Sequence, residues 1–188
     1  MSRPPNDRMR DRAVVPLSPG TAVRPSSVYL LPGALYCELE PRLVTTVLGS
    51  CVAVCLSDRE RELSGINHLV LPRRGGEGAS LRYGDVAIDR LVEAMLRLGG
   101  ALARIEAKVF GGAAVLPTNS PFNNVGTQNV EIAVERLAAL DIPIVARRTG
   151  GKSGMAVRLF TQSGEVHVKR IASSAARQAT AQAFGTPA

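Results

Sequence analysis

The sequence predicts an α+β fold, and three patterns support this prediction. Short segments rich in β-branched residues precede the first helical pattern, amphipathic helices follow, and a hairpin pattern lies near the end. The chain has 188 residues, of which 45% are apolar, so a single domain can bury a sizeable core. Only 4% are aromatic and none is Trp, so Val, Leu, Ile and Ala must build that core.

Strands are predicted where short apolar runs are bounded by Gly, Asp or Pro. Four such runs are "LVTTV" (43–47), "CVAVCL" (51–56), "GINHLVL" (65–71) and "RIEAKVF" (104–110). Near the end, "AVRLFT" and "EVHVKRI" flank a short turn that contains Ser163 and Gly164, which predicts a β-hairpin.

Two helices are predicted from apolar residues at helical spacing. The first begins at Asp85, which is expected to cap its N-terminus, and stops at Gly99 and Gly100. Its apolar face comprises Ile88, Leu91, Val92, Met95 and Leu98. The second ends before Pro143, and its apolar face comprises Val130, Ala133, Val134, Leu137 and Leu140.

Composition divides the chain into three parts. Residues 1–27 are rich in Pro, Arg and Ser and are expected to be a disordered basic tail, residues 28–171 to form the domain, and residues 172–188 to be a flexible tail. The formal net charge is +7, but residues 1–26 contribute +3 of it, from five Arg against two Asp. The rest has no basic stripe interleaved with aromatic residues, so no nucleic-acid partner is predicted. An acidic protein surface is at least as compatible with this charge.

The cysteine content and hydropathy predict a cytoplasmic protein. Three cysteines, an odd number, do not form the pattern of a disulfide framework, which favours a reducing compartment. No apolar run approaches the roughly 20 residues needed to cross a bilayer, so no membrane insertion is expected. The N-terminal segment lacks the apolar stretch of a secretory signal. No CxxC pair is present, and two Cys and one His supply too few ligands, so no metal is expected.

The candidate nucleophile lies in "TTVLGSCVAVC" (45–55), where Cys51 follows Gly49 and Ser50 at the entrance of a predicted strand. The turn can leave this thiol at a rim, with nearby backbone N–H groups free to face a developing oxyanion. Cys55 lies deeper in the strand, on the same face, and is expected to be buried and inert. The alternative is that Cys51 is simply a small buried hydrophobic residue.

A catalytic thiol needs a base beside it, and the chain has only two histidines. His68 follows Cys51 by 17 residues, enough for a strand, a turn and an adjacent antiparallel strand. His68 and Asn67 lie in an apolar run, where they are costly to bury unless they are hydrogen-bonded. The spacing therefore predicts a dyad of Cys51 and His68, and the alternative is a structural Cys with a satisfied core His. His167 alternates with Val residues in the hairpin and is expected on the solvent face.

Several blocks together resemble the chemoreceptor glutamine deamidase family, CheD. They are "TTVLGSCVAVCLSD", "GINHLVLP", "RYGDVAIDRLVEAMLRLGG", "AKVFGGAAV", "NNVGTQNV" and "TGG...TQSGEVHVK", and they cover about residues 28–170. The resemblance implies a mixed β-sheet or β-sandwich core flanked by helices, like that of bacterial deamidating toxins. It also implies a Cys-His-Thr triad with Cys51 as nucleophile, His68 as base and Thr45 as the third member, although the adjacent Thr46 leaves that position ambiguous. No cofactor is implied.

The resemblance implies deamidation of particular Gln side chains on the cytoplasmic helical bundle of chemotaxis receptors, and in some members hydrolysis of glutamyl methyl esters. It also implies a chemotaxis phosphatase, CheC, as a partner. The alternative is a docking module that binds such a phosphatase or a receptor with little turnover.

Supporting positions are predicted around the triad. Backbone N–H groups near Gly49, Ser50 and Cys51 are candidates for the oxyanion hole, and Asn67 is a candidate support. Gly111 and Gly112 are expected either to shape the wall of the site or to form a plain tight turn. Asn124, Gly126 and Asn129 are expected either to build a turn and helix entrance near the site or to give structural support only. The segment "KSGMAV" after Gly150-Gly151 departs from the family pattern, which has an Arg near Met155, a difference that bears on substrate contacts and leaves the triad intact.

Overall fold

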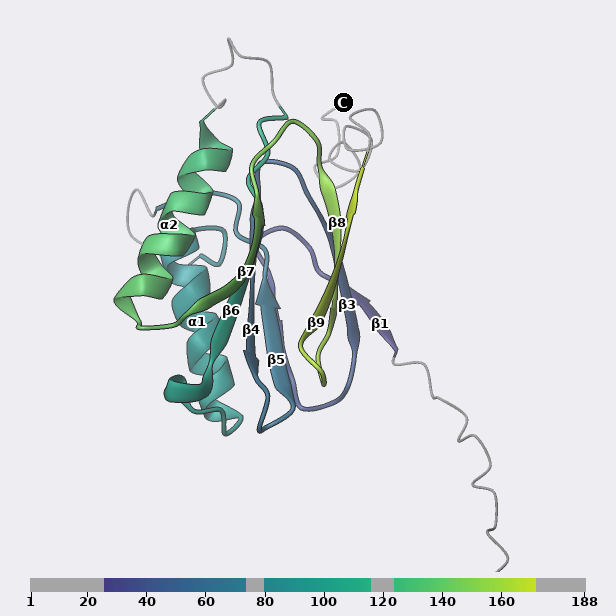
Figure 1. Ribbon diagram of the computed structural model, residues 1–188, viewed down its shortest axis with the longest axis vertical. Helices are drawn as coiled ribbons and strands as arrows, with labels where there is room; N and C mark the ends of the chain where they lie inside the picture. The colour runs from purple at the N-terminus through teal and green to yellow at the C-terminus, as the bar shows by residue number, and fades with distance from the viewer. Residues whose placement is uncertain (1–25, 74–79, 116–123, 172–188) are drawn as a thin grey trace, which may run out of the picture.

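Two β-sheets packed face to face form the body of the protein, and two helices cover one side of it (Figure 1). The computed structural model describes residues 26–73, 80–115 and 124–171. The predicted α+β fold with a sandwich core is confirmed. Ser27, which the sequence places in the N-terminal tail, begins the first strand. Residues 1–25 and 172–188, which make up the rest of the two predicted tails except for Ser26, lie outside the described residues.

The four-stranded sheet has the order β1-β3-β8-β9. Its strands are β1 (Ser27–Tyr29), β3 (Leu43–Leu48), β8 (Met155–Phe160) and β9 (Glu165–Arg170). β1 runs parallel to β3, whereas the other pairs are antiparallel. The predicted hairpin is confirmed as β8 and β9, and Gly164 in its turn has a φ of 68°, which glycine adopts without strain.

The five-stranded sheet has the order β2-β5-β4-β6-β7. Its strands are β2 (Leu35–Cys37), β4 (Val52–Asp58), β5 (Leu63–Asn67), β6 (Glu106–Gly111) and β7 (Ile144–Thr149). β4 and β5 are antiparallel neighbours, as the spacing of Cys51 and His68 predicts. β4 is central, and all seven of its residues are buried.

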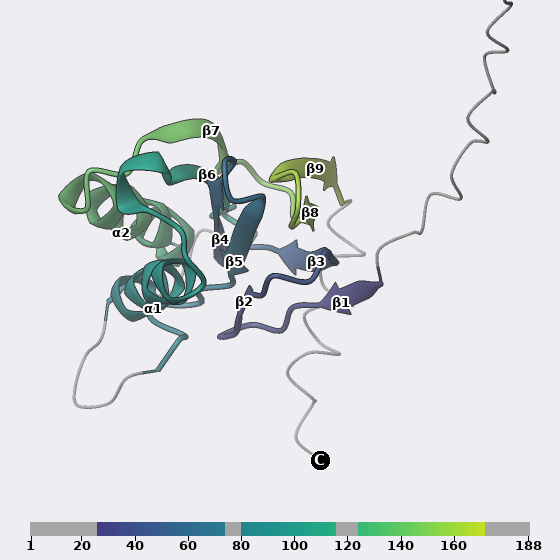
Figure 2. The ribbon, with the colours of Figure 1, turned by 90° about the horizontal axis from the view of Figure 1, so that it is seen from below.

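Helices α1 (Gly84–Arg97) and α2 (Val125–Ala139) cover the outer face of the five-stranded sheet (Figure 2). A short 3₁₀ turn, η1 (Leu102–Arg104), leads into β6. Asp85 was predicted as the N-cap of the first helix, and this is wrong: Tyr83 is the N-cap residue, and the Asp85 carboxylate instead accepts a hydrogen bond from the Val86 N–H. An acidic side chain in the first turn still favours the helix through its dipole.

The alternation along β4 divides the core into two layers. Val52, Val54 and Leu56 face the helices, whereas Ala53 and Cys55 face the four-stranded sheet, together with the partly buried Cys51. This is the division of faces that a period of two predicts. The thiol of Cys51 therefore belongs to the layer between the two sheets.

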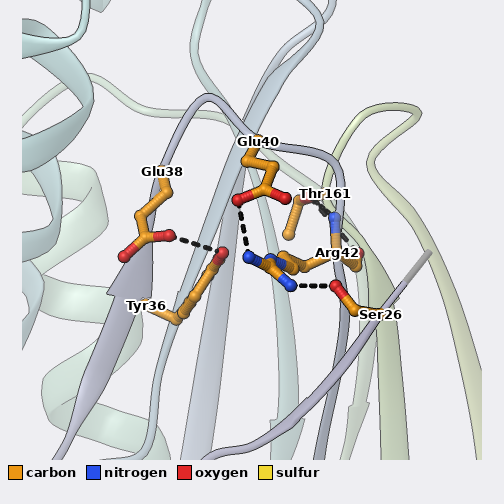
Figure 3. Close-up of polar contacts among 6 residues, drawn as sticks. All are labelled: Ser26, Tyr36, Glu38, Glu40, Arg42 and Thr161. Carbon is orange, nitrogen blue, oxygen red and sulfur yellow. Dashed lines mark hydrogen bonds and ion pairs between the residues drawn. The ribbon is translucent and has the colours of Figure 1, made fainter.

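A polar network closes the end of the sandwich where β3 begins (Figure 3). The Arg42 guanidinium contacts Ser26 and lies 2.5 Å from Glu40, while the Arg42 N–H donates to the Thr161 hydroxyl at 2.9 Å. The Tyr36 hydroxyl donates to Glu38 at 2.9 Å. These contacts fix the loop between β2 and β3, and they lie at the end of β3 remote from Gly49, so they stabilise the fold away from the candidate site.

None of the helices in the described ranges is long and apolar enough to pass through a lipid bilayer.

Candidate active site

Cys51 lies where the chain crosses from one sheet to the other. β3 of the four-stranded sheet ends at Leu48, the turn Gly49–Cys51 follows, and β4 of the five-stranded sheet begins at Val52. The Cys51 side chain is partly exposed, whereas Cys55 is fully buried, as predicted. This crossing point places the thiol at the rim of the layer between the sheets.

The carbonyl groups of this turn are held by the end of β6 and the residues after it. The Cys51 carbonyl accepts a hydrogen bond from the Gly112 N–H at 2.8 Å, and the Gly49 carbonyl accepts one from the Ala113 N–H at 2.9 Å. No carbonyl of the described residues accepts a hydrogen bond from the backbone N–H of Ser50 or Cys51. Two carbonyl groups of the turn are thus held by the end of β6 and the residues after it, while the N–H groups of Ser50 and Cys51 have no described backbone carbonyl as acceptor.

Gly111 and Gly112 are needed for this contact. Their φ angles are 106° and 72°, which side chains rarely adopt. A Cβ atom at Gly111 would lie 2.3 Å from the Cys51 carbonyl oxygen, and one at Gly112 would lie 2.7 Å from the carbonyl of Gly126 in α2. The two glycines therefore allow the backbone to approach the cysteine turn, which is more than a plain tight turn requires.

His68 lies directly after β5, and its place follows from the pairing with β4. Val52 and Leu69 exchange two backbone hydrogen bonds, of 3.1 and 2.9 Å. Continuing this register sets Ala53 opposite His68, so Cys51 and His68 are diagonal neighbours on one face of the sheet. The backbone of His68 is also held on its other side, by Gly33 and Ala34.

The His68 imidazole is 2% exposed and has one fixed partner. Its Nδ1 lies 2.8 Å from the Thr46 hydroxyl, which in turn donates to the Leu30 carbonyl at 2.9 Å. Because a hydroxyl has only one proton, the Thr46 oxygen must accept from Nδ1–H. Nε2 then carries a lone pair, and it is buried without a hydrogen-bond partner among the described residues. This tautomer is the one that can accept a proton at Nε2.

The predicted third residue, Thr45, does not contact His68. Its hydroxyl points instead towards the Val28 carbonyl, at 3.4 Å, whereas the adjacent Thr46 holds the ring. Successive side chains of β3 face opposite sides of the sheet, and Thr46 is the one that faces inwards, with 1% exposure. Of the two threonines, Thr46 is therefore the one that contacts the His68 ring.

Asn67 supports the site through the backbone of β4. It is fully buried, and its side-chain oxygen accepts a hydrogen bond from the Val54 N–H at 3.0 Å. The side chain therefore takes the place of a backbone acceptor at the end of the β4–β5 ladder. Asn67 and His68 each have one hydrogen-bond partner, while the side-chain nitrogen of Asn67, like Nε2 of His68, is buried without a partner among the described residues.

The surroundings keep both groups neutral. Burial raises the pKa of the Cys51 thiol to about 11, although Arg82 and the residue's own backbone N–H act in the opposite direction. Burial lowers the pKa of His68 to about 4, with the Leu30 carbonyl acting in the opposite direction. At neutral pH these pKa values correspond to a thiol and a neutral imidazole.

Arg82 is a candidate residue that the sequence did not reveal. It precedes α1, and its carbonyl accepts hydrogen bonds from the N–H groups of Val70 and Leu71, which follow His68 in the chain. Its side chain packs so closely on Gly33 that a Cβ atom there would lie 2.7 Å from the Arg82 Cγ. An exposed cation beside the Cys51 thiol favours its ionised form.

The pKa of His68 makes a prediction about stability. His68 has its ordinary pKa of 6.5 in the unfolded chain and a pKa of about 4 in the folded chain. Between these two pH values, the unfolded state therefore binds more protons at His68 than the folded state does. The contribution of His68 to the free energy of unfolding is fully present above pH 6.5, and it falls by about 3 kcal/mol as the pH drops towards 4. We expect His68→Gln to lose less of its free energy of unfolding over this pH range than the wild type does, as measured by denaturant titration at each pH.

The second histidine gives the control for this measurement. His167 is exposed, as predicted, and lies 2.6 Å from Glu165. His167→Gln should keep the wild-type dependence on pH. If His68→Gln lost as much stability as the wild type between pH 6.5 and 4, the buried neutral imidazole would not be the cause.

No three His, Cys, Asp or Glu side chains gather as metal ligands within residues 26–73, 80–115 and 124–171. The chemistry available to the described site is that of a thiol, an imidazole and unused backbone N–H groups. A cysteine, a histidine and a third side chain that orients the ring form the arrangement of cysteine-dependent hydrolases.

Comparisons with known proteins agree with this class. A family profile described as CheD chemotactic sensory transduction matches residues 70–170. A protein of Rhodospirillum rubrum named "Probable chemoreceptor glutamine deamidase CheD" is 53% identical over 146 residues, which cover 78% of this chain and 83% of that protein. Proteins of Trichlorobacter lovleyi, with the same name, and of Anaeromyxobacter dehalogenans, named CheD 1, are 42% and 39% identical over 143 and 154 residues. These alignments cover 76% and 82% of this chain, and 89% and 90% of the relatives. The chain belongs to the CheD family.

Proposed function

We propose that this protein deamidates glutamine side chains of chemotaxis receptors, with Cys51 as nucleophile, His68 as general base and Thr46 as the residue that orients His68. The names of the relatives support the deamidase activity and the receptor substrate. The observation that carries the residue roles is the buried, unpartnered Nε2 of His68, on the same sheet face as Cys51, with Nδ1 fixed by Thr46. Nothing in the relatives' names supports glutamyl methylesterase activity or a docking module with little turnover.

The mechanism follows from these positions. Nε2 of His68 takes the Cys51 proton as the sulfur attacks the carboxamide carbon, and the carbonyl electrons move to oxygen. The imidazolium then gives its proton to the departing nitrogen, so the C–N bond breaks, ammonia leaves and a thioester remains. His68 next takes a proton from water as the water attacks the thioester, and the thiol is restored as glutamate leaves. The sum is one amide and one water converted to one carboxylic acid and one ammonia.

The three free cysteines support a reducing, cytoplasmic location for this reaction. A CheC-like phosphatase stays a prediction of the family resemblance. Its binding would be tested by mixing the two purified proteins.

The function is tested on a purified receptor cytoplasmic domain in water enriched in ¹⁸O. Wild-type protein should convert particular Gln residues to Glu, and each new carboxylate should carry one heavy oxygen from the water. Cys51→Ala should leave the receptor peptides unchanged in the mass spectrum. The proposal fails if receptors from the same cell show no conversion by the wild type.

A second prediction separates the two threonines. Thr46→Val removes the acceptor for Nδ1–H of His68 and frees the ring to take the other tautomer. This change should lower kcat by about 10- to 100-fold, which is less than the roughly 10⁴-fold loss seen when an orienting carboxylate is removed. Thr46→Ser should restore most of the rate because it keeps the hydroxyl. Steady-state kinetics of receptor deamidation measures both.

Thr45→Val is the matched control for this pair, since the same chemical change is made one residue away. It should keep the wild-type rate. A large loss in Thr45→Val with none in Thr46→Val would return the role to Thr45.

A further inference from the structure

Asn129 in α2 joins the two segments that carry the candidate site, the turn of Cys51 and the residues that follow β5. It is fully buried, and its side-chain nitrogen donates to the Ser50 carbonyl at 3.0 Å and to the Val70 carbonyl at 2.9 Å. Ser50 precedes the nucleophile, and Val70 lies opposite Cys51 in the register set by Val52 and Leu69. One amide group thus bridges the cysteine turn and the strand that carries His68.

These contacts decide which way the peptide groups of the turn point. No cis peptide bond occurs in the described residues, so the carbonyl and the N–H of each peptide group point in opposite directions. The Ser50 carbonyl points towards Asn129 in α2, so the Cys51 N–H points away from that helix. The Gly49 carbonyl points towards the Ala113 N–H, so the Ser50 N–H points away from the segment after β6.

For neither of these two N–H groups does a described carbonyl act as acceptor. We infer that Asn129 is the positioning residue of the oxyanion hole: by holding the Ser50 carbonyl, it directs the Cys51 N–H to the substrate carbonyl oxygen. This inference rests on the proposed function of the site. Asn129 touches no reacting atom and acts only through the backbone of the cysteine turn.

The nature of the side chain fits this role. Only a group with two N–H bonds can donate to both carbonyls at once, and neither an Asp carboxylate nor an apolar side chain can do so. The side-chain oxygen of Asn129 is buried without a partner among the described residues, so the amide leaves one polar atom unsatisfied. α2 can come this close because of Gly126, where a Cβ atom would lie 2.7 Å from the Gly112 carbonyl oxygen.

The test compares two reactions of the same thiol. With p-nitrophenyl acetate, the sulfur bonds to the carbonyl carbon, the carbonyl electrons move to oxygen, and the oxyanion collapses as nitrophenolate leaves. With iodoacetamide, the sulfur bonds to a saturated carbon as iodide leaves, and no oxyanion forms. In both reactions His68 takes the thiol proton. An oxyanion hole can therefore accelerate only the first reaction.

We expect Asn129→Ser and Asn129→Asp to slow acylation of Cys51 by p-nitrophenyl acetate about tenfold or more, approaching the roughly 100-fold loss of a complete donor. Alkylation by iodoacetamide should stay within about twofold of the wild type. Thr127→Ala, an exposed position two residues away on the same helix, should change neither rate. Both rates are followed by mass spectrometry of the Cys51 peptide, beside a thermal melt of each variant.

Two results would overturn the inference. If both rates fell together, Asn129 would act on the thiol, the imidazole or the fold as a whole. If neither fell, the turn would keep its orientation without Asn129. The Asp variant keeps the size of the side chain, so a collapse of the fold in Asn129→Ser does not remove the test. A third result separates the two proposals. If the Asn129 variants lost acylation but the wild type deamidated no receptor, the proposed function would be rejected, whereas the role of Asn129 in positioning the oxyanion hole would stand.

Discussion

Cys51→Ala is expected to lower receptor deamidation by on the order of 10⁴- to 10⁶-fold, because no other group in the described structure can replace the nucleophile. Cys55 is fully buried, and burial raises its pKa to about 12. Cys37 lies in β2, away from the cysteine turn, and burial raises its pKa to about 11. The measurement is the initial rate of Gln-to-Glu conversion at saturating receptor, together with mass spectrometry of acid-quenched enzyme for the thioester.

Cys37→Ala is the matched control, since it removes a partly buried thiol elsewhere in the fold, on the side of the five-stranded sheet that faces the helices. It should keep both the rate and the thioester on the Cys51 peptide. Residual activity of Cys51→Ala within about tenfold of the wild type would contradict a covalent mechanism at this residue.

His68→Gln is expected to lower kcat by about 10²- to 10⁴-fold at neutral pH, because the thiol then has no base and its pKa lies near 11. The pH dependence should also change. The wild type needs neutral His68, whose pKa is about 4, so its activity should hold from neutral pH down to the range where that pKa or unfolding intervenes. In the variant, the rate should instead rise about tenfold per pH unit until the thiol itself ionises.

The control is again His167→Gln, which should reproduce the wild-type profile. Circular dichroism at each pH shows over which range the variants are folded, and rates are compared only there. A His68→Gln profile as flat as that of the wild type would show that His68 is not the base.

The sequence predicted the features that depend on local pattern. The alternation of "CVAVCL" places Cys51 and Cys55 on one face, and the structure confirms it, because a central strand has little freedom to change its period. The antiparallel neighbours β4 and β5 were predicted from spacing alone. The short strands β1 and β2 were not predicted, since three residues of an edge strand carry almost no pattern. The edge strand β7 was not predicted either, because its six residues, "IVARRT", do not alternate regularly between apolar and polar.

The site shows where such reasoning stops. Thr45 and Thr46 are identical in chemistry, and only the direction in which each faces from β3 decides which one meets His68. Arg82, from the segment before α1, and Asn129, from α2, reach the site through contacts between segments far apart in the chain. No local pattern encodes such contacts, so Arg82 was found only once the backbone was in place, and the sequence indicated for Asn129 only a place near the site or structural support.

The hydrogen bond from Thr46 to the Leu30 carbonyl has a consequence for the first strand. Leu30 directly follows β1, a three-residue strand at the edge of its sheet. The Leu30 N–H donates a hydrogen bond to the Thr45 carbonyl, and the Leu30 carbonyl accepts one from the Thr46 hydroxyl. If that edge separates from β3, the Thr46 proton loses its acceptor and can be given to Nδ1 instead. The ring proton then moves to Nε2, and the base is gone while every residue of the triad is still in place. Protection of the Leu30 amide from hydrogen exchange should therefore track deamidase activity.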